Sequence, residues 1–165
     1  MPQYLHHTLA PVFDARSRVL VLGSFPSPLS RQTGFYYGHP RNRFWPVLAA
    51  LWDEPVPPTP ADRRDFALRH RVALWDVIAE CSIDGADDGS IRDVTVNPLE
   101  VVFSQAGIAA VFTCGSKAHS LYRRHCLPRF GREAFLLPST SPANCRHYDF
   151  ERLVESYRVI RRYTD

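Results

Sequence analysis

The chain has 165 residues, 45% of them hydrophobic and 22% charged, and its formal net charge at pH 7 is +3. This length predicts one globular domain over residues 1–165, with a core large enough to be stable without a disulfide or a structural metal. No run of 18 apolar residues occurs, and the first 18 residues lack the apolar stretch of a signal peptide. We therefore expect no membrane insertion and a cytoplasmic location.

Charge and cysteine content narrow the chemistry further. The mildly basic charge permits nucleic-acid binding without requiring it. Lys117 is the only lysine, so amine nucleophiles are almost absent. The four cysteines form no C-x-x-C pair, which predicts reduced thiols and no metal site. They are Cys81, Cys114, Cys126 and Cys145.

The first predicted elements are a strand and a helix separated by a long loop. The run RVLVLG at residues 18–23 is apolar, rich in β-branched side chains and closed by glycine, which predicts a buried strand. The turn-forming sequence SFPSPLSRQTG at 24–34 predicts a loop. From Asn42 to Trp52 apolar side chains recur at helical spacing, and Pro46 fits the first turn of that helix.

A proline-rich connection at 53–60 leads to a second helix and a second strand. Thr59 is the predicted N-cap of a helix at 60–69. The run VALWDVI at 72–78 predicts a buried strand, whereas the acidic, glycine-containing stretch at 81–93 predicts a loop.

The second half of the chain continues the alternation. Asn97, followed by proline, is a predicted helix cap. IAAVFTCG at 108–115 predicts a third strand, and residues 116–126 predict a helix. EAFLLP at 133–138 predicts a fourth strand.

The last predicted element is a helix at 149–163 with Asp149 as its N-cap, after an exit loop at 138–148. Strands that alternate with helices predict a three-layer α/β fold with a central four-stranded, mainly parallel sheet flanked by helices. In such sheets ligands bind beyond the carboxyl ends of the strands. We therefore expect the site among the loops that leave those ends, at 24–41, 79–96 and 138–148.

The segment FYYGHPRNRFW at residues 35–45 contains more candidate functional side chains than any other stretch of the chain. Aromatic faces stack on bases, arginines hold phosphates, and an asparagine amide can orient a water. The structural alternative is a helix entrance with core aromatics and two solvated arginines. Nucleotide-binding glycine motifs, the G-x-S-x-G elbow and H-E-x-x-H are absent from the chain. A triad built on Ser139 has no specific support.

Four segments together resemble a known family. GSFPS, FYYGHPRNRFW, VALWDVI and LLPSTSPAN are similar to motifs of the uracil-DNA glycosylase superfamily, and the branch they most resemble is that of the hypoxanthine (deoxyinosine) DNA glycosylases. That branch is related to the mismatch-specific uracil/thymine glycosylases. The resemblance covers nearly the whole chain and implies a DNA glycosylase that needs no cofactor or metal.

The resemblance also implies roles for individual residues. Mismatch-specific relatives place a water-positioning Asn where this chain has Phe25, so Asn42 of the H-P-x-N-R-F-W motif is the implied catalytic residue. Tyr37 lies where relatives place an aromatic that stacks on the extruded base. Asp76 lies near a base-reading position, although a cap of local backbone is an equal alternative. The implied substrate-binding residues are Ser24, Phe25, Tyr37, His39, Asp76 and Ser139.

The second motif implies contacts to DNA. It contacts phosphate in relatives and carries a wedge that enters the duplex, here around Ala143 and Asn144. The implied DNA-binding residues are Ser27, Ser30, Arg41, Lys117, Ser141, Ala143, Asn144 and Arg146.

These roles predict a monomeric, monofunctional glycosylase that hydrolyses the N-glycosidic bond of deaminated bases in DNA, hypoxanthine first and uracil second. The alternatives are a mismatch-specific uracil/thymine glycosylase and a non-catalytic DNA-binding module on the same scaffold. Phe25 favours the non-catalytic module, and the retained Asn42 argues against it. A generic nucleotide hydrolase lacks the carboxylate cluster that it would need.

Overall fold

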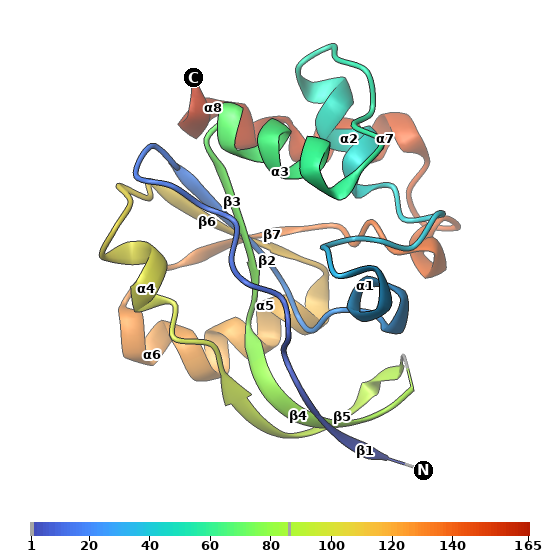
Figure 1. Ribbon diagram of the computed structural model, residues 1–165, viewed down its shortest axis with the longest axis vertical. Coiled ribbons are helices and arrows are strands. Elements are labelled where there is room, and N and C mark those ends of the chain that lie inside the picture. The colour runs from blue at the N-terminus through green and yellow to red at the C-terminus, as the bar shows by residue number, and fades with distance from the viewer. Residues whose placement is uncertain (1, 86) are drawn as a thin grey trace.

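The computed structural model describes residues 2–85 and 87–165 (Figure 1). Its central layer consists of β2 (Val19–Gly23), β3 (Val72–Asp76), β6 (Ala110–Cys114) and β7 (Ala134–Leu137). These strands form one sheet in the order β3-β2-β6-β7, and every neighbouring pair is parallel. The predicted four-stranded sheet is therefore confirmed. All residues of β2 and β3 are buried, as continuous apolar strands in a covered parallel sheet require.

Helices cover both faces of this sheet (Figure 1). On one side lie α2 (Phe44–Leu51), α3 (Pro60–Arg69), α7 (Phe150–Tyr157) and α8 (Arg161–Thr164). On the other side lie α4 (Glu100–Phe103), α5 (Ser116–Leu121) and α6 (Leu127–Phe130). A π-helical turn, Tyr122–Cys126, joins α5 to α6, and a 3₁₀ turn, Arg158–Ile160, joins α7 to α8. The predicted helices at 116–126 and 149–163 are thus continuous but irregular.

Local capping explains where two of these helices begin. The Thr59 hydroxyl accepts from the Asp62 N–H at 3.1 Å, and the Asp149 carboxylate accepts from the Arg152 N–H at 2.8 Å. Both predicted caps are confirmed. The core between the sheet and α2, α3 and α7 is aromatic, and its largest fully buried side chains include Phe44, Trp45, Phe66, Phe112 and Tyr157.

The loop predicted at 24–34 contains a short helix, α1 (Pro28–Thr33). The Ser27 hydroxyl accepts from the Ser30 N–H at 3.1 Å, and Gly34 ends the helix with a left-handed φ of 80°. The turn-forming residues of this stretch therefore act as helix caps, a use that the same residue types share with turns.

The loop prediction at 81–93 was wrong. Here β4 (Ile78–Asp84) and β5 (Asp87–Val96) form an antiparallel hairpin, and β1 (Gln3–His6) completes a three-stranded sheet in the order β1-β4-β5. Cys81, Ile83 and Ile91 are buried while their polar neighbours face outward. Acidic residues and glycine obscured this alternation, which register shifts between β4 and β5 also interrupt.

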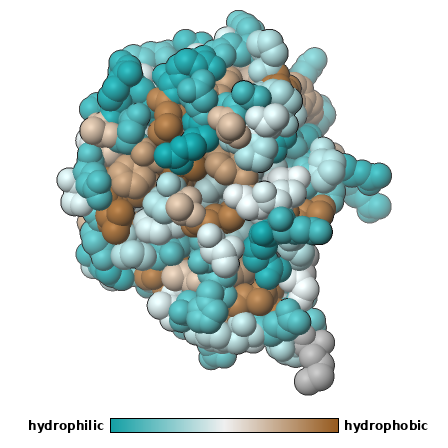
Figure 2. Space-filling model, in the orientation of Figure 1, coloured by the Kyte–Doolittle hydropathy of each residue, from teal (hydrophilic) through white to brown (hydrophobic). Residues whose placement is uncertain are grey.

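The cap predicted at Asn97 was also wrong. The Asn97 amide instead donates to the carbonyl oxygens of Asp76 and Ile78, at 2.9 and 3.1 Å, and so holds the end of β3 against the start of β4. Within the described ranges no helix is long and apolar enough to cross a membrane. On the face seen in Figure 2, hydrophobic side chains form small groups among hydrophilic ones.

Candidate active site

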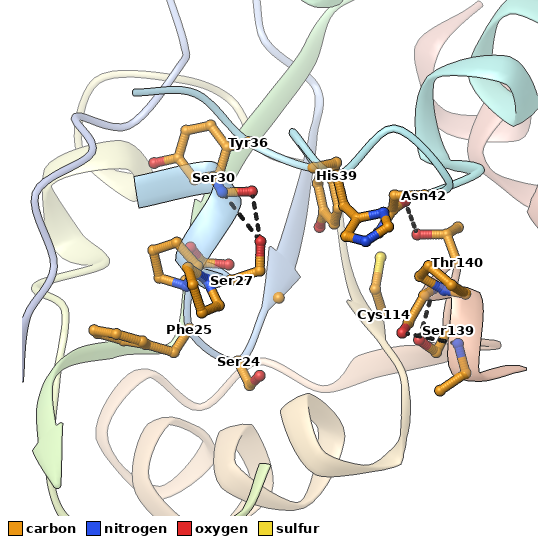
Figure 3. A pocket seen from close by; sticks show the side chains of 18 of the residues that line it. Ser24, Phe25, Ser27, Ser30, Tyr36, His39, Asn42, Cys114, Ser139 and Thr140 are labelled. Carbon is orange, nitrogen blue, oxygen red and sulfur yellow. Dashed lines mark hydrogen bonds between the residues drawn. The ribbon is translucent and has the colours of Figure 1, made fainter. Parts of the chain in front are cut away.

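A cavity of about 410 Å³ opens beyond the carboxyl ends of β2, β3 and β6. It is lined by parts of 23–30, 36–42 and 139–143, with Asp76 and Cys114 from the strand ends. Ile83 and Gly85 of the hairpin complete the wall. Figure 3 shows Phe25, Ser27 and Tyr36 on one side and His39, Asn42, Thr140 and Ser139 on the other. All three loops expected to form the site thus contribute to one cavity of the size that small ligands use.

Asn42 is held in a single orientation at the start of α2. Its Oδ1 accepts from the Phe44 N–H at 2.9 Å and from the Thr140 hydroxyl at 2.7 Å (Figure 3). Two donors identify the amide oxygen, so the NH₂ group is the part of Asn42 that remains for the cavity. The side chain is therefore a hydrogen-bond donor towards any bound molecule.

The loop at 138–148 is fastened to the helical layer. The Arg43 N–H donates to Thr140 O at 3.1 Å, and Nη1 of Arg43 donates to Tyr148 O at 2.6 Å. From α7, the Tyr157 hydroxyl donates to Pro138 O at 2.6 Å. These bonds place Thr140 against Asn42 with little freedom, which a preorganised site requires.

Tyr37 contributes an aromatic wall. Its φ of 54° is left-handed, and its ring stacks on Phe44 with centroids 3.8 Å apart and an interplanar angle of 12°. The opposite ring face is left for the cavity that Tyr37 lines. Burial raises the pKa of Tyr37 well above its usual value, and burial also raises the pKa of Cys114 to about 11. At neutral pH both groups are therefore protonated and uncharged.

Asp76 lies at the end of β3, opposite Gly23 of β2. Its Oδ2 is 2.8 Å from Nε2 of His7, and the two side chains are only 5% and 2% exposed. A Cβ on Gly23 would come within 2.5 Å of Asp76 Oδ1, so glycine is needed for the carboxylate to lie there. No sequence motif indicated His7, which follows β1 and lies 69 residues from its partner.

Phe25 packs into the wall where relatives of the mismatch-specific type carry a polar amide. Its ring meets the His7 ring edge-on at 6.0 Å, and the Arg31 guanidinium lies 5.7 Å from its centroid. No group on Phe25 can orient water. His39 supplies a polar group instead, because its Nδ1 accepts from the Arg41 N–H at 3.0 Å and leaves Nε2–H as a donor.

Serines from α1 and the 138–148 loop also line the cavity, together with Ser24 and Ala143. Ser139 Oγ accepts from the Ser141 N–H at 3.1 Å, which shapes the loop and leaves the Ser139 hydroxyl proton available. Ser30 is only 2% exposed, and its hydroxyl accepts from the Gly38 N–H at 2.9 Å. Ser30 therefore supports the loop, and its burial argues against the predicted contact with phosphate.

Of the remaining predicted DNA-binding residues, Ala143 lines the cavity, whereas Arg41, Lys117, Asn144 and Arg146 do not. Arg41 and Arg146 are exposed, and Lys117 lies in the first turn of α5. The Asn144 amide donates to Ser139 O at 2.9 Å, so it is used inside the loop, whereas Ala143 is exposed at the cavity rim. The sequence did not single out His7, which supports Asp76 from outside the cavity. Nor did it single out the lining residues Tyr36, Ile83, Gly85, Cys114 and Thr140. In residues 2–85 and 87–165 no three histidine, cysteine or acidic side chains are grouped to hold a metal ion.

The sequence profile of the uracil DNA glycosylase superfamily matches residues 10–162. The chain belongs to this superfamily. A hypoxanthine DNA glycosylase from Methanosarcina barkeri is 32% identical over 137 residues, which cover 82% of this chain and 86% of that protein. A hypoxanthine DNA glycosylase from Methanosarcina acetivorans is 30% identical over 136 residues, covering 82% and 85%.

The fold of the chain is also similar to that of a solved structure. The solution NMR structure of a candidate uracil DNA glycosylase from Methanosarcina acetivorans superimposes with a TM-score of 0.83 at 28% identity. The match covers 99% of this chain and all of that one. The resemblance to the superfamily drawn from four sequence segments is therefore confirmed.

Proposed function

We propose that the protein is a monofunctional DNA glycosylase that removes deaminated bases from DNA, with hypoxanthine as the first substrate and uracil as the second. Superfamily membership and the names of the two relatives support this activity. The observation that carries the proposal is the fixed amide of Asn42, whose oxygen is engaged by Phe44 and Thr140 and whose NH₂ is left for the cavity.

In the proposed reaction the target nucleotide leaves the stack and its base enters the cavity, at a cost of a few kcal/mol that is smallest at mispairs. Cleavage of the glycosidic bond passes through an oxocarbenium-like sugar, while negative charge develops on the departing base. Water adds at the anomeric carbon, and the proton that it loses neutralises the departed base. Donors placed in advance stabilise such charge. The Asn42 NH₂ and the His39 Nε2–H supply donors of this kind, so we assign Asn42 to the leaving base rather than to activation of water.

Two other wall residues receive the base in this proposal. The free face of Tyr37 stacks on it, while Phe44 supports the ring from behind. Asp76 accepts from N1–H of hypoxanthine or N3–H of uracil. The edge of the base that pairs in DNA is thereby read by hydrogen bonds and its face by stacking, as other base-flipping enzymes do.

The rim of the cavity is the proposed contact with DNA. Hydroxyls of Ser27, Ser139 and Ser141 hold flanking phosphates, and Ala143 with Asn144 fills the vacated stack. Arg41, Lys117 and Arg146 lie further out, as phosphate-binding cations do. The reaction needs no cofactor.

The described residues that line the cavity run from Gly23 to Ala143, which supports one domain over residues 1–165, and we propose that it acts as a monomer. Cys114, Cys126 and Cys145 are free thiols, which supports a reducing cytoplasmic compartment.

Single-turnover assays on oligonucleotides that contain inosine, uracil or only normal bases test the proposal. Asn42→Ala should lower excision roughly 10²-fold, the scale of losing one such donor. Asn42→Asp is the matched variant, because a carboxylate keeps both acceptor bonds but replaces the NH₂ donor by a negatively charged acceptor, and it should lower excision at least as much as Asn42→Ala. Near-wild-type excision by a folded Asn42→Ala protein would refute the role of Asn42.

Phe25 favours a second function, a DNA-binding module without catalysis, because it stands where the resemblance implies a water-positioning Asn in mismatch-specific glycosylases. That function predicts tight, selective binding of inosine-containing DNA with no release of base by the wild-type protein. The same oligonucleotides, followed by electrophoretic mobility as well as by base release, separate the two functions.

A further inference from the structure

His7 follows β1 directly and packs behind the residues that line the cavity. Its backbone N–H donates to Ala79 O of β4 at 2.6 Å, which fixes the residue to the antiparallel sheet. The ring lies against two cavity-lining aromatics, Phe25 and Tyr36, with centroids 6.0 and 6.2 Å away. Since the side chain is only 2% exposed, its polar atoms must find partners within the protein.

The hydrogen bonds of His7 identify the ring nitrogen that carries the proton. The Leu9 N–H points at Nδ1 with an N···N distance of 3.3 Å, so Nδ1 is an acceptor. Nε2 lies 2.8 Å from Asp76 Oδ2, and an ionised carboxylate only accepts. Nε2 therefore carries the proton, and His7 faces Asp76 as a neutral donor.

This bond leaves Asp76 with one oxygen for the cavity. Oδ2 is engaged by His7, while Oδ1 lies over Gly23, which lines the same cavity. The Asp76 carbonyl accepts from the Asn97 amide at 2.9 Å, so the backbone is held as firmly as the side chain. A fixed carboxylate of this kind presents a hydrogen-bond acceptor at one point and no donor.

We propose that His7 is a positioning residue for base selection, an inference that rests on the proposed glycosylase function. Its Nε2–H holds Asp76 as an acceptor for a base N–H. Without that donor the buried carboxylate loses its partner and its fixed rotamer. In an Asp76→Asn protein, His7 takes the amide oxygen and turns the NH₂ towards the cavity, which replaces the acceptor by a donor.

The first test is independent of activity. Long-range ¹H–¹⁵N NMR spectra of the wild-type protein at neutral pH report which imidazole nitrogen is protonated. We expect the His7 proton on Nε2, with Nδ1 unprotonated. A proton on Nδ1, or rapid exchange between the two forms, would overturn the proposed arrangement whether or not the protein excises bases.

The second test is single-turnover excision from inosine-containing DNA by four variants. His7→Phe keeps a ring but loses the donor, and should lower the rate about tenfold or more, as expected for a hydrogen bond to a charged group. His7→Gln, whose amide reaches the place of Nε2, should restore most of the rate, whereas the shorter His7→Asn should not. His6→Phe is the matched control, because His6 also faces a carboxylate, Glu80 at 2.8 Å, but is 65% exposed.

A double-variant comparison shows whether His7 acts through Asp76. In an Asp76→Ala background, His7→Phe should cause no further loss, whereas independent losses would refute the positioning role. If His7→Phe does not fold, the contrast between His7→Gln and His7→Asn decides the question, and equal rates for those two variants would refute it. An inactive wild-type protein would refute the glycosylase proposal instead, and the NMR test of His7 would still stand.

Discussion

The Thr140 hydroxyl donates to Asn42 Oδ1 at 2.7 Å across a sequence separation of 98 residues. This bond joins two of the four segments that carry the resemblance to the superfamily, one at the start of α2 and one after β7. Thr140 is only 1% exposed, and its own carbonyl accepts from the Arg43 N–H. The orientation of the proposed catalytic amide is therefore set by the loop that also forms the rim towards DNA.

Replacing Thr140 by valine should lower inosine excision about three- to tenfold, because one neutral hydrogen bond is lost while the volume is kept. Thr140→Ser should restore the rate. Thr95→Val on the exposed side of β5 is the matched control. Single-turnover rates and thermal melting measured together separate loss of orientation from loss of folding, and an unchanged rate for a folded Thr140→Val protein would contradict the assigned bond.

Tyr37→Ala should reduce excision by roughly 10- to 100-fold, because base stacking contributes about 1–3 kcal/mol. Tyr37→Phe should remain close to wild type. The ring face carries the proposed contact, whereas the hydroxyl is buried. Equal losses in the two variants would show that the hydroxyl matters and the stacking role is wrong.

Gly23→Ala should abolish most activity while keeping the fold. The new Cβ would lie 2.5 Å from Asp76 Oδ1, so the carboxylate must move, and the overpacking should lower the free energy of unfolding by about 1–3 kcal/mol. Gly107→Ala is the control, because its Cβ would meet only Arg18 Nη1 at 3.5 Å. If Gly23→Ala excised inosine as fast as Gly107→Ala, the placement of Asp76 would not matter for the reaction.

The product should be an intact abasic site, with strand breakage only after alkali or heat. Strand cleavage through a Schiff base needs an amine nucleophile. Lys117, the only lysine, is not among the described residues that line the cavity. Borohydride reduction during turnover on inosine-containing DNA is the measurement, and a covalent protein–DNA adduct would overturn the monofunctional proposal.

Strands β2 and β3 of the central sheet were predictable because their burial on both faces makes them continuous apolar runs, as in residues 18–23 and 72–78. The β4–β5 hairpin was not, because its buried positions alternate with acidic residues and are interrupted by register shifts. Strand β1 is short and largely exposed, so its sequence shows no apolar pattern at all.

Some residues of the candidate site were likewise predictable from the sequence and others were not. Asn42, Tyr37 and Ser139 lie within short motifs whose residue types indicate a binding or catalytic role. The structure brings all three to one cavity. His7 has no such motif. Its place beside Asp76 depends on the pairing of β1 with β4, and on the space that Gly23 leaves, both of which exist only after folding. The donor role of Asn42 likewise follows from Thr140, not from the asparagine itself.

The cavity is built from residues spread along most of the chain, which determines when during synthesis the protein can become active. The chain leaves the ribosome from its N-terminus. The wall at 139–143 emerges near the end of synthesis, and the Tyr157 hydroxyl that holds Pro138 emerges later still. Because a domain folds as a unit, the complete cavity exists only after α7 has left the ribosome, and truncation within α7, which removes buried Tyr157, should leave a protein that cannot excise bases.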